Sequence, residues 1–521
     1  MFTCSYSIRY IRMRILKAII VACVVAIVLP ARAFTVNGIN YEATGSQTAS
    51  VVANWPNYVG SVSIPKTVEY DGVTYTVDAI APRAFQGAEF LTSVSMQNTV
   101  KSIGDNAFDG CLKLNKVVIP SSVSYLGSRA FAECASLSTV TFKGNALTEL
   151  SNSTFFNCKS LRTITLPDKI YAIRSLAFAG SGLERITMGA DLNTIEPFAF
   201  DECNSMRSVN VKNIRKWCDI DFISVYDNPL YRARTMLVNG DTLKNLKIPE
   251  GVTAIKPFVF AGCNASTIEI PSSVTTIDIS AFLYCSYITD VYIPNTVKSL
   301  DTSHLIDTDR PFPYVESIYV GKGIEVIPTG TFYFSYRLKS LIMMEGLKEI
   351  GHDAFKYSKI PHIVLPQTLK VLQASFANCT LLETVTIGPA LRRMIGGVFS
   401  QCKYLREIHC QVKNPSDVVF INTGQFNGVD LENCVLYVPS ASVNKYKKDP
   451  NWGVFKKILP DINQPDIDRS GIVDVEDVNK LVNTFLGLGK PGCNATAADV
   501  NHDGMPDIED VNIIINTILK L

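Results

Sequence analysis

The sequence predicts a repeat solenoid, with a small β cap before it and a small all-α domain after it. At 521 residues and 47% hydrophobic content, the chain is too long for one compact core and too apolar to be disordered. A phenylalanine recurs in runs with steps of 21 to 24 residues, which indicates stacked coils of one type. The recurring residues are Phe85, Phe108, Phe131, Phe155, Phe178, Phe200, Phe260, Phe282, Phe332, Phe355, Phe376 and Phe399.

Each cycle divides into a strand half and a turn half. Segments such as "LNKVVIP" and "LRTITLP" alternate β-branched and polar residues and end at proline, which is typical of a short strand with one buried face. The segment that follows, such as "SSVSYLGSRAF", brings the phenylalanine back inward. No single cycle can bury its own apolar face. The cycles are therefore expected to stack as strands about 4.8 Å apart in one long sheet.

A cysteine often lies three residues after the recurring phenylalanine, and other cycles have Ala88, Ser181, Ser335 or Ser358 in that place. A position shared by Cys, Ala and Ser selects for small size, so we expect buried thiols without disulfides. A metal or redox ladder is the alternative, but the close Cys or His pairs that such sites use are missing. The cysteines are Cys111, Cys134, Cys158, Cys203, Cys263, Cys285, Cys379 and Cys402.

Residues 1–33 are typical of an export signal. Basic residues at positions 9 to 17 precede the apolar run "AIIVACVVAIVLP", and "ARA" before Phe34 suits a signal peptidase. The alternatives are a membrane anchor, for which the run is short, and a lipoprotein modified at Cys23. After cleavage no transmembrane segment is expected, and the protein would be secreted or held at the cell surface.

The segments around the repeats differ from them. Residues 34–78 alternate aromatic and β-branched residues with "NG" and "DG" turns, which predicts a β-meander that caps the first coil. The solenoid then covers residues 79–459. An insertion near residues 212–246 contains a hairpin signal at "VNGD", and residues 301–317 lengthen another cycle. Residues 426–459 are expected to close the array with a last strand and a short amphipathic helix.

The segment "IPSSVSYLGSRAFAECASLSTVTF" resembles the BspA-like leucine-rich repeat proteins of bacteria, in unit length and in the order Phe, Cys, Leu. The resemblance covers roughly residues 79–440. It implies a curved leucine-rich repeat solenoid with a sheet on one face. It also implies a secreted or surface protein that adheres to host or microbial ligands.

The acidic end of the chain predicts a calcium-binding domain. Residues 460–521 contain 11 acidic and four basic residues, and the segments "DIDRSGIVDVED" and "DVNHDGMPDIED" begin 33 residues apart. Each has oxygen-bearing side chains at positions 1, 3, 5, 9 and 12 and glycine at position 6, the pattern of a loop that wraps Ca²⁺. The predicted ligands of two Ca²⁺ ions are Asp466, Asp468, Ser470, the Ile472 carbonyl, Asp474 and Asp477, then Asp499, Asn501, Asp503, the Met505 carbonyl, Asp507 and Asp510.

Each loop runs directly into an apolar helical segment, with Asp rather than Glu at position 12 and no entering helix. This combination resembles a type I dockerin. The resemblance implies a cohesin-type partner, recognised through Val475 and Glu476 in one copy and Ile508 and Glu509 in the other. A disordered acidic tail is the alternative.

Alternate strand residues of the solenoid point away from its core and form a ladder. Tyr292, Tyr319, Ile342 and Val364 make this ladder apolar in the later half, so Tyr292 and Tyr319 are candidate ligand-binding residues. The alternative is that such residues simply suit strands. The whole ladder is Val118, Thr141, Thr165, Thr187, Asn210, Glu269, Tyr292, Tyr319, Ile342, Val364, Thr386 and His409.

Function follows from these features taken together. A net charge of +1 argues against binding to nucleic acid. Five scattered histidines, with no nucleophile motif and no phosphate loop, argue against an enzyme. We expect a non-catalytic recognition or adhesion protein whose solenoid binds a protein or glycan ligand. The alternative is a non-catalytic component of a polysaccharide-degrading multiprotein complex.

Overall fold

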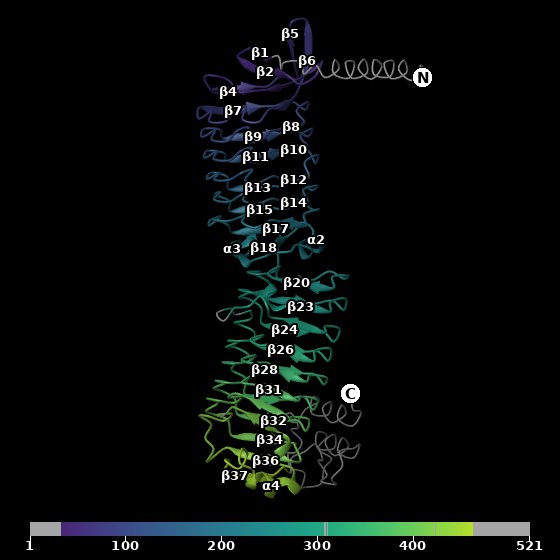
Figure 1. Ribbon diagram of the computed structural model, residues 1–521, viewed down its shortest axis with the longest axis vertical. Coiled ribbons are helices and arrows are strands. Elements are labelled where there is room, and N and C mark those ends of the chain that lie inside the picture. The colour runs from purple at the N-terminus through teal and green to yellow at the C-terminus, as the bar shows by residue number, and fades with distance from the viewer. Residues whose placement is uncertain (1–32, 307–308, 310, 423, 462–521) are drawn as a thin grey trace, which may run out of the picture. The chain divides into compact units, whose positions relative to one another are not determined.

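The computed structural model describes residues 33–306, 309, 311–422 and 424–461. These residues form two compact units, and the chain divides between them after Met206. Apart from Ala33, Pro460 and Asp461, the predicted signal sequence and the acidic C-terminal segment therefore lie outside the described residues. In both units the coils follow one another as successive rungs of parallel strands (Figure 1).

Each coil of the first unit, residues 33–206, contributes a longer strand to one sheet and a two-residue strand to an opposite sheet. We call these the long-strand sheet and the short-strand sheet. The long strands are β4 (Gly60–Ser63), β7 (Leu91–Ser95), β9 (Lys116–Ile119), β11 (Thr139–Phe142), β13 (Thr163–Thr165) and β15 (Arg185–Thr187). The short strands are β8 (Ser102–Ile103), β10 (Tyr125–Leu126), β12 (Glu149–Leu150), β14 (Ala172–Ile173) and β16 (Thr194–Ile195).

Residues 33–80 form β1 (Ala33–Val36), β2 (Ile39–Ala43), β3 (Thr48–Val51), β5 (Thr67–Tyr70) and β6 (Val73–Ile80) in addition to β4. The expected meander over residues 34–78 forms only in part. Antiparallel pairs join β1 to β2, β2 to β3 and β5 to β6, but β3 pairs in parallel with β6, and β4 in parallel with β7. The solenoid sheets thus begin inside this segment, because "SVSIPKTV" at residue 61 repeats "SVSMQNTV" at residue 93.

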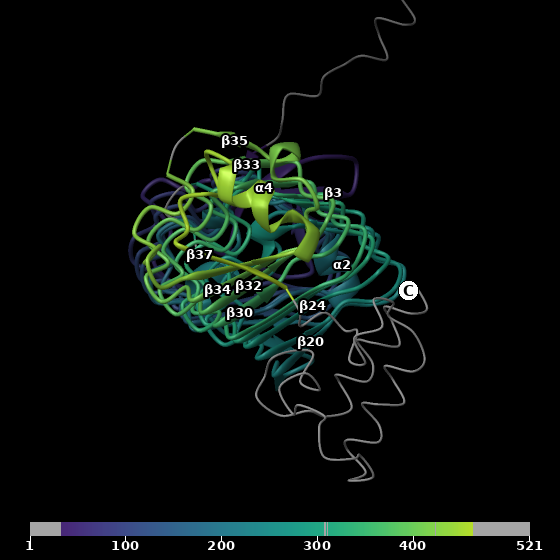
Figure 2. The same ribbon diagram turned by 90° about the horizontal axis from the view of Figure 1, so that it is seen from below.

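The second unit, residues 207–461, repeats the same two-sheet arrangement. Its long strands are β17 (Ser208–Val211), β18 (Met236–Val238), β20 (Asn245–Lys247), β22 (Thr267–Glu269), β24 (Asp290–Ile293), β26 (Ser317–Val320), β28 (Ser340–Met343), β30 (His362–Val364), β32 (Thr384–Ile387), β34 (Glu407–Cys410), β36 (Val435–Val438) and β37 (Lys457–Pro460). Its short strands are β21 (Ala254–Ile255), β23 (Thr276–Asp278), β25 (Ser299–Asp301), β27 (Val326–Ile327), β29 (Glu349–Ile350), β31 (Val371–Gln373), β33 (Arg393–Ile395) and β35 (Val419–Ile421). Seen from below, β30, β32, β34 and β37 lie on one wall and β33 and β35 on the other (Figure 2).

The insertion between β17 and β20 carries helices α2 (Ile214–Cys218), η1 (Val225–Asp227) and α3 (Pro229–Ala233). The hairpin predicted at "VNGD" is confirmed, since β18 pairs in antiparallel fashion with β19 (Asp241–Thr242). Asn239 and Gly240 at its tip have φ of 52° and 94°, as a two-residue hairpin turn requires. Trp217 of α2 is buried and donates a hydrogen bond of 2.8 Å from Nε1 to the Val259 carbonyl, which fixes the insertion to the next coil.

Stacked phenylalanines form the shared interior of the coils. From Phe85 to Phe200, neighbouring rings have centroids 4.8 to 5.7 Å apart and nearly parallel planes. In the second unit the stack includes Phe312, between Phe282 and Phe332, and it ends at Phe426. The repeat spacing identified neither Phe312 nor Phe426. Each ring contributes to the interior of two coils, so the stack supplies the burial that a single coil lacks.

The cysteine prediction is confirmed for the eight repeat cysteines, all of which are buried and free. Most of these thiols donate a hydrogen bond of 3.1 to 3.3 Å to the carbonyl of the phenylalanine one coil earlier, as Cys134 does to Phe108. Ser335 makes the same bond to Phe312, at 3.3 Å. The position therefore selects for a small side chain, and in most coils that side chain also donates a hydrogen bond; Ala88 meets the size requirement alone.

The last coil closes on aromatic side chains. Helix α4 (Val443–Lys448) follows β36 and crosses the end of the unit (Figure 2). Trp452 and Phe455 pack against Phe426 with ring centroids 5.8 and 4.9 Å away, so that the final phenylalanine is covered. Three short 3-10 helices complete the unit: η2 (Ile279–Phe282), η3 (Pro415–Asp417) and η4 (Ser440–Ser442).

Candidate ligand-binding strip

The predicted ladder forms on the long-strand sheet of the second unit. Tyr292, Tyr319 and Ile342 are directly opposite one another on β24, β26 and β28. Val364 continues the ladder on the neighbouring strand β30. We call these four residues the apolar strip. Tyr292, Ile342 and Val364 are each more than half exposed, at 52%, 53% and 57%, which is unusual for apolar side chains in a row.

The two tyrosines of the strip support each other. Their rings are stacked with centroids 4.6 Å apart and planes 13° from parallel. Burial and the neighbouring Tyr292 raise the pKa of Tyr319 above its usual value, so its hydroxyl is protonated at neutral pH. A rigid pair of aromatic rings loses little conformational entropy when a ligand covers it, which favours binding at this place.

In the first unit the same ladder is polar and β-branched. Val118 is opposite Thr141, and Thr165 is opposite Thr187, in the registers that the repeat predicts. The exposed aromatic residues of the ladder therefore belong to the second unit. This difference between two copies of one sheet type shows that strand propensity alone does not require aromatic residues on the outward face.

The ladder runs beyond the residues that the sequence identified. His409 on β34 is opposite Tyr437 on β36, whose ring stacks on it at 4.7 Å, and Leu459 follows on β37. His409 is buried, with Nδ1 3.2 Å from Asp461 Oδ2 and Nε2 3.6 Å from Glu407 Oε2. Burial lowers its pKa, but the hydrogen bonds and charges of both carboxylates outweigh burial and raise the pKa to about 9. At neutral pH the ladder therefore contains a buried, protonated imidazole two strands beyond Val364.

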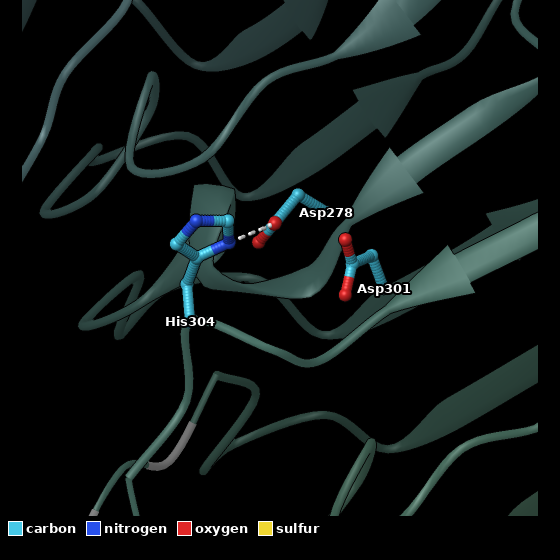
Figure 3. A group of neighbouring side chains, drawn as sticks. All are labelled: Asp278, Asp301 and His304. Atoms are coloured by element: carbon cyan, nitrogen blue, oxygen red, sulfur yellow. Dashed lines mark hydrogen bonds and ion pairs between the residues drawn. The ribbon is translucent and has the colours of Figure 1, made fainter.

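A second group of side chains lies on the short-strand sheet of the same unit. Asp278 ends β23, Asp301 ends β25, and His304 follows three residues later (Figure 3). Their candidate ligand atoms all lie within 4.8 Å of one another. The imidazole Nδ1 of His304 is 2.7 Å from Asp278 Oδ2. The sequence analysis did not identify this group, although the two aspartates are one repeat apart.

The described thiols are poorly suited to nucleophilic chemistry. All are buried, and burial raises the pKa of Cys263 and Cys402 to about 12, far from the range in which a thiolate forms at neutral pH. The remaining predicted site residues lie outside the described residues. They are the twelve calcium ligands from Asp466 to Asp510 and the recognition residues Val475, Glu476, Ile508 and Glu509. Within the described part of the chain, no helix is long and apolar enough to cross a bilayer.

The fold and the strip define a class of protein, a repeat solenoid that exposes a sheet face. A family model described as "BspA type Leucine rich repeat region" matches residues 78–207, 237–309 and 312–442 in six copies. The chain belongs to this BspA-type leucine-rich repeat family. The match is interrupted at residues 208–236, where α2, η1 and α3 form.

Several solved structures are similar to the chain. A leucine-rich repeat protein from Bacteroides ovatus is 21% identical over 72% of this chain and 94% of its own, with a TM-score of 0.39. A leucine rich cell surface protein from Faecalibacterium prausnitzii is 24% identical over 75% and 98%, with a TM-score of 0.35. The pneumococcal vaccine antigen PcpA is 16% identical over 83% and 99%, with a TM-score of 0.30. No curated protein matches the chain.

Proposed function

We propose that this protein is an exported, non-catalytic recognition protein whose solenoid binds a protein or glycan ligand through the apolar strip. The observation that supports this most is the row Tyr292, Tyr319, Ile342 and Val364, in which Tyr319 is half-buried, the other three are exposed, and the two tyrosines are stacked. Aromatic residues in rigid, exposed rows are frequent at binding hot spots. Membership of a leucine-rich repeat family supports binding rather than catalysis.

The strip is tested with the paired replacement Tyr292→Ala and Tyr319→Ala in the intact chain. Ligands are first identified by probing panels of host-matrix proteins and glycan arrays with the wild-type chain. We expect the paired variant to bind the identified ligand at least roughly tenfold more weakly, because each exposed ring at a hot spot contributes more than about 1 kcal/mol.

The matched control is the pair Tyr287→Ala and Tyr404→Ala. These tyrosines are exposed by 64% and 56% in the same unit but lie in turns before β24 and β34, away from the strip. The control pair should bind as the wild type does. Equal loss in both pairs, or no loss in either, would show that the strip is not the binding surface.

We further propose that residues 460–521 are a calcium-loaded dockerin-like domain with two Ca²⁺ sites and a cohesin-type partner. The support is the repeated ligand spacing from Asp466 and from Asp499, each followed by an apolar helical segment. The intact chain should capture its partner from membrane and secreted fractions in the presence of Ca²⁺ and release it with a chelator.

The near-identity of Val475 and Glu476 with Ile508 and Glu509 predicts that either copy can face the partner. Replacing one pair by alanine should preserve calcium-dependent capture, and replacing both pairs should abolish it. A complete loss from a single pair would contradict this dual use. Unchanged capture in a chelator would contradict the role of calcium.

The second candidate function is a non-catalytic component of a polysaccharide-handling complex. The dockerin-like pattern favours it, because such modules join proteins into multiprotein assemblies. Binding on glycan arrays alone would support this candidate, whereas binding to matrix proteins would support adhesion.

A further inference from the structure

We propose that Asp278, Asp301 and His304 form a site for one divalent transition-metal ion, and that zinc fits it best. This site is independent of the apolar strip and of the predicted calcium loops. It lies on the short-strand sheet, where Asp301 lies beside the hydrogen-bonded pair of His304 and Asp278 and one candidate ligand atom of each residue is within 4.8 Å of the others (Figure 3).

The repeat places the two carboxylates together. Asp278 and Asp301 are opposite each other as the last residues of the paired strands β23 and β25, so their backbones are one strand spacing apart, about 4.8 Å. The chain after β25 turns back, which brings His304 Nδ1 to 2.7 Å from Asp278 Oδ2. Three potential ligands therefore come from two adjacent coils.

Neighbouring groups hold the three side chains in place. The Ser280 amide and hydroxyl donate to Oδ1 of Asp278 at 2.9 and 2.5 Å, which leaves Oδ2 facing His304. The Ser303 amide donates to Asp301 Oδ1 at 2.8 Å. The ring of Phe258 meets the imidazole edge on, with centroids 5.8 Å apart. Such supporting contacts orient ligands around a metal ion.

The balance of charge favours a bound cation. Among the described residues, His304 is the only ion-pair partner of Asp278, whose side chain is 6% exposed, and neither aspartate pairs with lysine or arginine.

A comparison within the molecule shows what is missing at this site. On the short-strand sheet of the first unit, Arg174 forms ion pairs with two carboxylates, those of Glu149 at 2.6 Å and Glu196 at 2.8 Å. There the chain supplies the cation itself. At Asp278 and Asp301 the partner is the imidazole of His304. An imidazole can bind a dication, and that dication would neutralise the two carboxylates.

The donor atoms select the kind of ion. Two carboxylate oxygens and one imidazole nitrogen suit Zn²⁺, with water completing the coordination. Calcium requires six to eight oxygen ligands, which these three side chains do not provide.

The test uses the intact chain with isotope-labelled histidine, because the protein contains only five histidines. Zinc is titrated in excess calcium, which occupies the predicted calcium loops, and the imidazole signals are followed by NMR. We expect the His304 signal to change until one equivalent of zinc is bound. The signal of His352 should not change. Its Nδ1 lies 3.3 Å from Asp353 Oδ1, but among the described residues no second carboxylate joins this pair to form a three-ligand cluster.

Variants give a second measurement. Asp301→Asn should weaken zinc binding at least tenfold by calorimetry, whereas the control His352→Ala should leave zinc affinity unchanged. Zinc binding that leaves the His304 signal unaltered would overturn the proposal, as would wild-type affinity in a folded Asp301→Asn variant. If that variant does not fold, the His304 signal of the wild-type chain still decides.

Discussion

The protonated imidazole of His409 makes the stability of the second unit depend on pH. Its Nδ1 and Nε2 lie 3.2 and 3.6 Å from the carboxylates of Asp461 and Glu407, and its side chain is 8% exposed. The pKa is raised to about 9, against about 6.5 in an unfolded chain, a difference that corresponds to about 3 kcal/mol. Because the folded pKa is the higher one, this stabilisation is complete below about pH 6.5 and is lost as the pH rises through 9.

His409→Gln should remove the part of the pH dependence that His409 contributes. In urea unfolding of the intact chain between pH 6 and pH 10, followed by a probe in the second unit, the stability of the wild type relative to the variant should fall by about 3 kcal/mol. The buried thiols, whose raised pKa also lowers stability at high pH, affect both proteins alike. The control is His362→Gln, because the His362 Nδ1 lies 2.8 Å from the Thr384 hydroxyl rather than between carboxylates. A pH profile shared by wild type and His409→Gln, or an NMR pKa near 6.5 for His409, would refute the reasoning.

Three further predictions concern the shared interior. Phe131→Ala should destabilise the first unit by about 3 to 5 kcal/mol in chemical unfolding, because a fully buried ring leaves a cavity, whereas Phe90→Ala at an exposed position should cost under about 1 kcal/mol. Cys134→Ser should cost about 1 kcal/mol and Cys134→Val more, since serine keeps the donor to Phe108 and valine does not; the opposite order would exclude the hydrogen bond as the reason. Gly127→Ala should destabilise by more than about 1 kcal/mol, because the new Cβ would lie 2.4 Å from the Asp105 amide, and a neutral result would contradict that contact.

Much of the fold could be predicted because the repeat is long and regular. The interval between phenylalanines fixes which residues are equivalent, and the two-residue period of a strand fixes which of them face outward. Thus Tyr292 and Tyr319 could be placed opposite each other on one exposed face before the structure was known. The same reasoning predicted that Cys134 is a buried thiol under a turn, without a disulfide.

The sequence analysis missed features where the spacing changes. Phe312 occupies the phenylalanine position of its coil, but the extra residues before it hid the repeat. The strand β4 carries the repeat motif but lies among the aromatic residues of the first hairpins. The contact of His304 with Asp278 depends on the turn after β25, which no periodic pattern encodes.

The turns also contain residues with a left-handed backbone conformation. Asn106 and Gly110, two residues before and after Phe108, have φ of 55° and 75°, and equivalent positions in other coils repeat this. At Phe334 and Tyr357 the same left-handed conformation is taken by aromatic residues, with φ of 60° and 67°. Their rings stack at 4.5 Å, which offsets part of the strain. The sequence gives no sign of this, because glycine is absent there.

The proposed role of the apolar strip is tested most directly by hydroxyl-radical footprinting of the intact chain with and without its identified ligand. This method reports the solvent exposure of each tyrosine side chain. Tyr292 and Tyr319 should become protected when the ligand binds, while Tyr287 and Tyr404 remain as reactive as in the free protein. Protection of Tyr287 or Tyr404 with unchanged labelling of Tyr292 would place the ligand elsewhere and contradict the account.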